Sequence, residues 1–333
     1  MSLLSVLGSA CSTASYLWQA GMGQMELFNR ARPISEVITD EKTSPRIRQL
    51  LADVAIMKKF GEKMGLKPTR NYEHYVRLDR KVVVYVVSGS RPLAFKPYEW
   101  SFPIVGSFPY LGFFDREDAF RYSRTIEDQG WDVDVRGAQA YSTLGWFRDP
   151  VLSSMIPEGD EAFGELANVI LHESVHATYY VNDQSTFNES LASFVADEMT
   201  PVFLKERFGE SSVEYKSYRE ADEKSEKRGK KMHEAYVKLE KLYASNASEA
   251  DKKTEKDRII AGLKEELKWP KERAMNNATL FQFKTYGGGS EAFKSLFARC
   301  EKNWTQFFSK ISKVNEKSFS KKQSEDLGFL GNI

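Results

Sequence analysis

The sequence predicts an α+β protein that is predominantly helical, with a small β-sheet in its N-terminal half and a long charged helical hairpin in its C-terminal half. Tyr- and Val-rich runs bounded by turn residues are confined to the first half of the chain. Longer runs with helical periodicity follow from residue 159 onward. Lys and Glu dominate residues 212–266. Strands early and helices late are typical of an α+β arrangement.

Composition limits the classes of protein that the chain can represent. With 333 residues and 41% apolar content, it can bury the core of one large domain or of two packed ones. Charged residues make up 29% and nearly cancel to a net charge of +1, so no global basic field favours a nucleic-acid partner. Two cysteines are too few for a disulfide framework.

Residues 1–11, MSLLSVLGSAC, are small and apolar and end in Cys11. They resemble the end of a bacterial lipoprotein signal, in which the cysteine becomes the lipidated first residue of the mature protein. This interpretation predicts membrane attachment through Cys11, at the periplasmic face of the bacterial cell envelope. The stretch is short and lacks Lys and Arg, so a plain N-terminal helix in a cytoplasmic protein is the alternative.

Residues 12–158 are predicted to form an N-terminal α+β region. Apolar spacing predicts helices over 14–30 and 44–66 and a third that Asp115 caps and Gly130 ends. The predicted strands are a hairpin of 71–78 and 81–88, short strands within the aromatic loop 92–114, and strands over 131–135 and 141–147.

Residues 159–333 are predicted to be helical. Helices over 159–181 and 187–208 come first and make up the region 159–208, the second with a kink near Pro201. The charged hairpin 212–266 follows, with a break near residues 245–248, and its charges are typical of a solvated surface. Closing helices over 268–283 and 290–313 complete the region 268–313, separated by three glycines.

The pattern that carries chemistry is HESVH at residues 172–176. On a helix, positions i and i+4 share a face, so His172 and His176 can direct both imidazoles at one metal ion. Glu173 is rotated by one position and is suited to act as the general base on a metal-activated water. The preceding apolar residues predict a buried helix, in which two histidines and a glutamate without a metal would need costly hydrogen-bond partners.

A catalytic zinc site needs a third protein ligand and one open position. Glu189 opens the next predicted helix, which we expect Asn188 to cap. The connector VNDQST is short, so two antiparallel helices would bring Glu189 back beside the histidines. Asp197 or Glu198, further along that helix, is a candidate acceptor for a histidine N–H. An N-terminal carboxylate favoured by the helix dipole is the alternative for Glu189.

Hydrolysis of a peptide bond also needs a donor for the tetrahedral oxyanion. Tyr286, just before the three glycines, is the first candidate, with a packed core tyrosine as the alternative. The remaining histidines, His74 in a predicted strand and His233 in the charged hairpin, fit structural and solvated positions better.

The pairing of HESVH with the downstream NESLA resembles the gluzincin metallopeptidases, whose third ligand is the Glu of the second motif. The closer similarity is to a family of bacterial aminopeptidases in that group, often expected to be lipoproteins. The resembling stretches run from about residue 11 to 310: YLWQAGMGQMELF, RGAQAYSTLGWFRDPVLSSM, LHESVHATYYVNDQSTFNESLASFV and NNATLFQFKTYGGG.

This resemblance implies a zincin-like fold, zinc as the cofactor and a peptide as the substrate. It also implies that 141–147 is an edge strand along which the peptide pairs, with Tyr141, Ser142, Leu144, Gly145 and Trp146 as substrate-binding residues. The acidic motif with which other gluzincin aminopeptidases bind the free amine has no equivalent here, so the residues leave exopeptidase and endopeptidase open. A non-catalytic envelope protein with a structural metal, or with none, is the alternative function.

Overall fold

A computed structural model of the chain describes residues 3–102, 106–140, 148–284 and 288–333. The chain divides into two compact units that are interleaved along the sequence. Unit 1 comprises residues 1–31, 76–141 and 235–282, and unit 2 comprises 32–75, 142–234 and 283–333. This division differs from the expected boundary between consecutive regions at residue 158.

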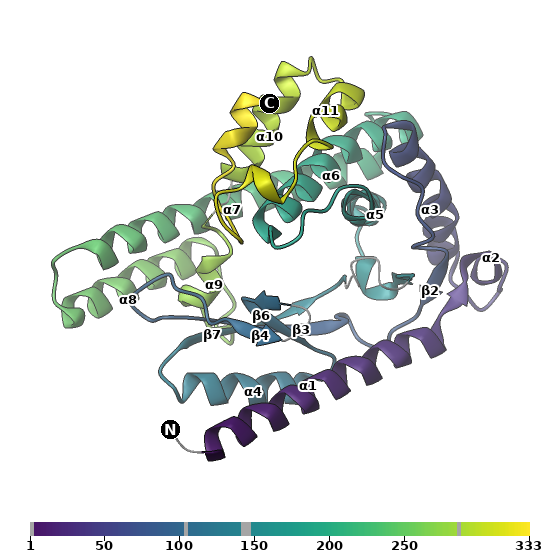
Figure 1. Cartoon of the computed structure of the whole chain (residues 1–333). Coiled ribbons are helices and arrows are strands. Elements are labelled where there is room, and N and C mark those ends of the chain that lie inside the picture. Colours follow the sequence, from purple (N-terminus) through teal and green to yellow (C-terminus); the bar gives the residue numbers. More distant parts are fainter. Residues whose placement is uncertain (1–2, 103–105, 141–147, 285–287) are drawn as a thin grey trace. The chain divides into compact units, whose positions relative to one another are not determined.

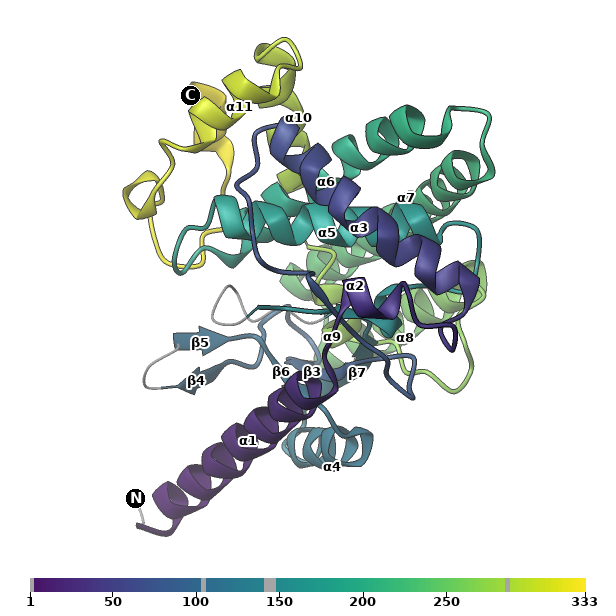
Figure 2. The same cartoon turned by 90° about the vertical axis from the view of Figure 1, so that its right-hand side faces the viewer.

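Unit 1 is built on an antiparallel sheet with the strand order β6-β3-β7. The strands are β6 (Tyr110–Phe113), β3 (Val84–Ser90) and β7 (Asp132–Ala138). Helices α1 (Leu3–Arg30) and α4 (Arg116–Glu127) lie on one face of this sheet and α9 (Asn277–Phe281) on the other (Figures 1 and 2). A separate two-stranded sheet pairs β4 (Trp100–Phe102) with β5 (Gly106–Phe108).

The core of unit 1 lies between the sheet and α4. It contains Val87 from β3, Phe113 from β6 and Ile126 from α4, each 5% exposed or less. The helix begins as the sequence predicts, because the Asp115 side chain accepts a hydrogen bond from the Asp118 backbone N–H at 2.9 Å. Gly130 follows it with a φ of +79°, a conformation that glycine adopts without strain.

The predicted hairpin of residues 71–78 and 81–88 is wrong. Strand β2 (His74–Val76) pairs with β1 (Arg32–Pro33) in a sheet of order β1-β2-β8, where β8 is Val151–Leu152. Strand β3 pairs with β6 and β7 instead. Asp79, expected at the tip of a turn, accepts a hydrogen bond from Arg30 at 2.9 Å. The strand partners come from distant segments, and tertiary contacts override the local turn signal.

Unit 2 is mainly helical. Its principal helices are α3 (Pro45–Lys63), α5 (Ala162–Thr178), α6 (Ser185–Phe208), α10 (Gly288–Arg299) and α11 (Trp304–Ile311). Helices α5 and α6 pack on each other, α3 packs on α5, and α10 packs on α6 (Figure 1). Short elements complete the unit: α2 (Ile34–Val37), and the 3₁₀ helices Ser153–Met155, Glu316–Ser318 and Gly328–Asn332.

The charged segment 212–266 forms two helices, α7 (Val213–Ala244) and α8 (Glu249–Glu266). The break lies where the sequence predicts it, and the Ser248 side chain caps α8 by accepting a hydrogen bond from the Asp251 N–H at 3.1 Å. The chain passes from unit 2 to unit 1 at residue 235, inside α7. The mostly helical α+β class and the small sheets in the N-terminal half are therefore confirmed.

The predicted closing helices are only partly correct. Within 268–283, the only α-helix is α9, because Lys268 has a φ of +48° and ends the preceding helix. The predicted helix 290–313 is two helices, divided where Glu301 and Lys302 adopt φ values of +53° and +55°. Asn303 then caps α11. Among the described helices, none combines the length and apolar character that crossing a membrane requires.

Candidate metal centre

Helix α5 holds the two histidines in a fixed setting. Its apolar side, with Ile170, Leu171 and Val175, is fully buried, and each such side chain contributes about 1.5–3 kcal/mol to folding. His172 and His176 follow one another by one helical turn, so they lie on the same side of α5. Their ring centroids are 4.9 Å apart, with an interplanar angle of 83°.

Helix α6 brings a carboxylate to this pair. One oxygen of Glu189 lies 3.4 Å from Nε2 of His172, and the other lies 3.5 Å from Nε2 of His176. One ligand atom from each of the three residues can be chosen so that all lie within 4.8 Å of one another. The structure thus brings together the three side chains that the sequence singles out.

Asn188 has a different role from the predicted helix cap. Helix α6 begins earlier, at Ser185, so Asn188 lies in its first turn. The Asn188 side chain donates to the Val181 carbonyl at 2.8 Å and accepts from the Val181 N–H at 2.9 Å. These buried bonds tie the α5–α6 connector to α6 and fix where Glu189 stands relative to α5.

The three side chains differ in burial. The side chain of His176 is 5% exposed, that of His172 is 20% exposed, and that of Glu189 is 60% exposed. Burial lowers the pKa of the His172 ring, but its bond to Glu189 and the nearby carboxylates outweigh this and raise the pKa above its ordinary value. Burial raises the pKa of Glu189, but hydrogen bonds from both histidines lower it overall. The cluster is therefore an acid–base set that opens toward solvent at Glu189.

The donor chemistry of this cluster fits zinc. Two imidazole nitrogens and one carboxylate oxygen are a ligand set of catalytic zinc sites, in which the fourth position takes water or substrate. The fit rests on residue types and on the convergence of their ligand atoms. It is the same chemistry that the HESVH and NESLA motifs predict.

Asp197, a predicted acceptor for a histidine N–H, acts on His172 through its charge. Asp197 accepts a hydrogen bond from Asn168 at 2.9 Å, and Asn168 also donates to the hydroxyl of Tyr218 at 3.0 Å. The charge of Asp197 is one of those that raise the pKa of His172. Nδ1 of His176 is buried and has no hydrogen-bond partner in the described part of the chain.

Tyr72 lies within the electrostatic reach of the predicted general base. Its side chain is 2% exposed and its φ is +62°, a left-handed conformation that costs about 1–2 kcal/mol for a non-glycine residue. The Tyr72 N–H donates to the Asp149 carbonyl at 2.7 Å, which holds this conformation. Burial raises the pKa of the Tyr72 phenol, and the charges of Glu173 and Asp149 raise it further.

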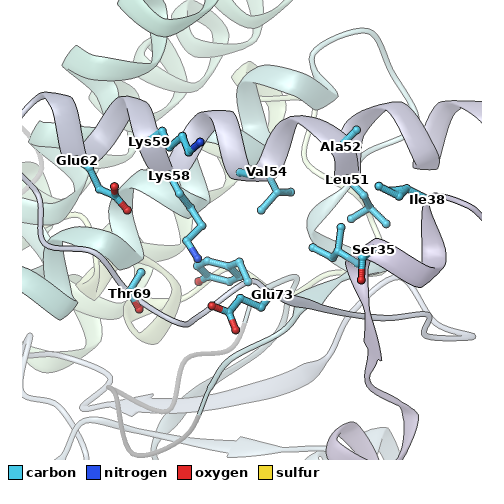
Figure 3. Close-up of a pocket in the computed structure, with 13 residues that line it drawn as sticks. Ser35, Ile38, Leu51, Ala52, Val54, Lys58, Lys59, Glu62, Thr69 and Glu73 are labelled. Atoms are coloured by element: carbon cyan, nitrogen blue, oxygen red, sulfur yellow. The ribbon is translucent and has the colours of Figure 1, made fainter.

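Tyr72 also lines a cavity of about 540 Å³ beside α3. The walls include Leu51 and Val54, and Lys58 reaches from α3 toward the loop that carries Thr69 (Figure 3). The Lys58 ammonium donates to the Asn71 carbonyl at 2.8 Å. Tyr72 therefore belongs both to the lining of this cavity and to the surroundings of Glu173.

Tyr180 is a functional candidate that the sequence reasoning missed. It is 47% exposed, and its ring centroid lies 6.3 Å from that of His176. Burial raises the pKa of its phenol, and the nearby charge of Glu189 raises it further. It follows His176 by four positions, which was the available signal: the same spacing that joins the two histidines.

Several predicted residues fall outside what the structure describes. Tyr286 and the predicted edge strand 141–147 lie outside the described residues. The strand includes the five predicted substrate-binding residues Tyr141, Ser142, Leu144, Gly145 and Trp146. Cys11 belongs to α1, but its side chain is not among the described ones.

The other two histidines stand apart from the cluster. His74 is in strand β2, and Nδ1 of His233 lies 2.8 Å from the carbonyl of Phe283.

Comparisons with known proteins identify a family for the chain. No curated protein and no solved structure is significantly similar to the chain, so the zincin-like fold stays a prediction. A protein-family model described as "Putative aminopeptidase" matches residues 15–326, which include both motifs and nearly the whole chain. The chain therefore belongs to this aminopeptidase family.

Proposed function

We propose that the chain is a zinc-dependent peptidase in which His172, His176 and Glu189 hold the metal and Glu173 is the general base. The observation that carries the proposal is the convergence of the three ligand atoms on one another. Membership of an aminopeptidase family supports the same reaction class. Within that class, the family favours removal of N-terminal residues over internal cleavage.

The chain's own residues have distinct roles in this proposal. A bound zinc ion supplies Lewis-acid chemistry, activating water and polarising the scissile carbonyl. Glu173 accepts the proton of the attacking water and later delivers it to the leaving amine. Glu189 is the exposed member of the cluster, so the substrate would approach from its side.

The developing oxyanion needs a donor from the protein. Tyr286 remains the prediction from sequence, and Tyr180 is a described tyrosine near the cluster. Replacing the tyrosine that supplies this donor by phenylalanine, Tyr286→Phe or Tyr180→Phe, would lower kcat more than it changes KM, since the donor acts in the transition state.

The substrate and the location of the protein are proposed from the resemblance. Residues 141–147 would pair with the peptide backbone as an edge strand. Cys11 would carry the lipid that attaches the chain to the bacterial envelope, and mass spectrometry of the membrane fraction tests this by looking for a diacylated N-terminal cysteine.

Metal analysis combined with one substitution tests the hydrolase proposal. We expect about one zinc ion per chain and cleavage of N-terminal residues from a peptide library. Glu173→Gln should keep the zinc and lose at least about 10³-fold in kcat, because the general base is removed while the ligands stay. Equal cleavage by both proteins, or a chain that binds no zinc, would instead favour the non-catalytic envelope protein.

A further inference from the structure

One side of α1 carries large apolar side chains that are exposed to solvent. Trp18, Met22, Met25 and Phe28 are 73%, 51%, 57% and 42% exposed. Their spacing of four, three and three residues aligns them along one side of the helix. Single exposed apolar residues are ordinary, whereas a continuous row of them is typical of an interaction surface. We call these four residues the α1 row.

The opposite side of α1 is fixed to unit 1. Leu27 is 1% exposed. The Gln19 side chain donates to the Gly112 carbonyl at 3.1 Å and accepts from the Phe114 N–H at 3.2 Å. These bonds hold the helix beside strand β6, so turning the α1 row inward would break them. The row therefore stays available to an external partner.

Helix α1 itself carries little charge. Residues 1–25 contain no charged side chain. The first charged residues, Glu26 and Arg30, form an ion pair of 2.9 Å, and each has a further ionic partner, Arg80 for Glu26 and Asp79 for Arg30. The row itself therefore carries no charge, and no charged residue precedes it in the sequence.

This composition fits a lipid bilayer better than a charged protein surface. Tryptophan combines an apolar ring with an N–H donor and favours the membrane interface. Methionine and phenylalanine bury apolar area among acyl chains, and no Lys or Arg on this side adds attraction to anionic lipids. We propose that the α1 row lies in the interface of a lipid bilayer, with the helix in the membrane plane. This proposal is independent of peptide hydrolysis.

Vesicle binding tests the proposal with the full chain. The Cys11→Ser variant excludes acylation, and the probe is phosphatidylcholine vesicles in a flotation assay. We expect Trp18→Gln, Met22→Gln and Met25→Gln together to lower the partition coefficient at least about tenfold, because apolar area leaves the interface. Adding phosphatidylglycerol should change binding less than about threefold, because the row has no basic residues.

A matched control removes exposed apolar side chains elsewhere. Ile56→Gln, Val202→Gln and Val213→Gln together alter residues that are 41%, 42% and 57% exposed, and should leave vesicle binding unchanged. Equal binding by the α1 triple variant and its parent would overturn the proposal. Absence of vesicle binding by the parent protein would also overturn it. If sedimentation velocity then shows a dimer that the α1 triple variant dissociates, the partner of the row is a second copy of the chain.

Discussion

Two polar clusters in this protein, one in each unit, use similar side chains in opposite ways. In unit 1, Lys256 pairs with Asp132 and donates to the Pro92 carbonyl at 2.9 Å, while Asp132 also accepts from the Asn277 N–H at 3.0 Å. In unit 2, His172, His176 and Glu189 converge on one another. The first cluster joins segments of the fold through backbone groups, and the second gathers ligand atoms at one point.

Burial and the partners of the remaining polar groups distinguish a structural cluster from a candidate binding site. The ion pair of unit 1 is buried, with side chains 9% and 17% exposed, and its remaining bonds go to the main chain. The carboxylate in unit 2, that of Glu189, is 60% exposed and comes from helix α6. Polar groups that are buried and satisfied contribute to folding, whereas those that converge and open to solvent can bind a ligand.

The largest expected effect is on the unit 2 cluster. His176→Ala should lower zinc affinity on the order of 10⁴-fold and abolish peptide cleavage, because a three-ligand site loses one ligand. Titration with a zinc chelator measures the affinity. The free energy of unfolding in the absence of metal should change far less, and a collapse of the fold would contradict the separation between the clusters.

The next largest effect is expected in unit 1, where a substitution should lower stability and leave zinc binding unchanged. Lys256→Met leaves Asp132 buried without its cation and should cost about 3–5 kcal/mol of unfolding free energy. Urea denaturation measures this cost. Zinc content per folded chain should stay the same, so loss of zinc from folded protein would show that the clusters are coupled.

A smaller effect is expected for the carboxylate that acts on His172. Asp197→Asn removes a charge that raises the pKa of this histidine and should weaken zinc binding by about 10–100-fold, as outer-shell substitutions do. Glu198→Gln, one position along α6, is the control. If both substitutions change the affinity equally, Asp197 has no specific role.

The smallest effect concerns Asp134, which is 4% exposed beside the unit 1 cluster. Burial raises its pKa, against weaker opposing effects of Arg273 and Thr279. A raised folded-state pKa means that stability is highest below the unfolded value of about 3.9 and falls as pH rises through the folded value. Asp134→Asn should therefore raise the free energy of unfolding at pH 7 by about 1 kcal/mol. Thermal denaturation from pH 4 to 8 checks this, and an equal pH dependence for both proteins would contradict it.

Features with local causes were predictable from sequence. The helix after Asp115, its end at Gly130 and the break before Ser248 follow from capping chemistry within a few residues. The proximity of His172 and His176 follows from helical geometry alone. The position of Glu189 beside the two histidines could also be predicted, because the connector between helices α5 and α6 is short.

The predominantly helical class, the two charged helices and the residues of the candidate metal centre could be predicted, because each depends on periodicity or on neighbours in the chain. The partners of β2 and β3, and the effect of the Glu173 charge on the pKa of Tyr72, depend on the folded chain. These contacts join segments far apart in sequence, and their stability comes from burial and pairing that no local pattern records.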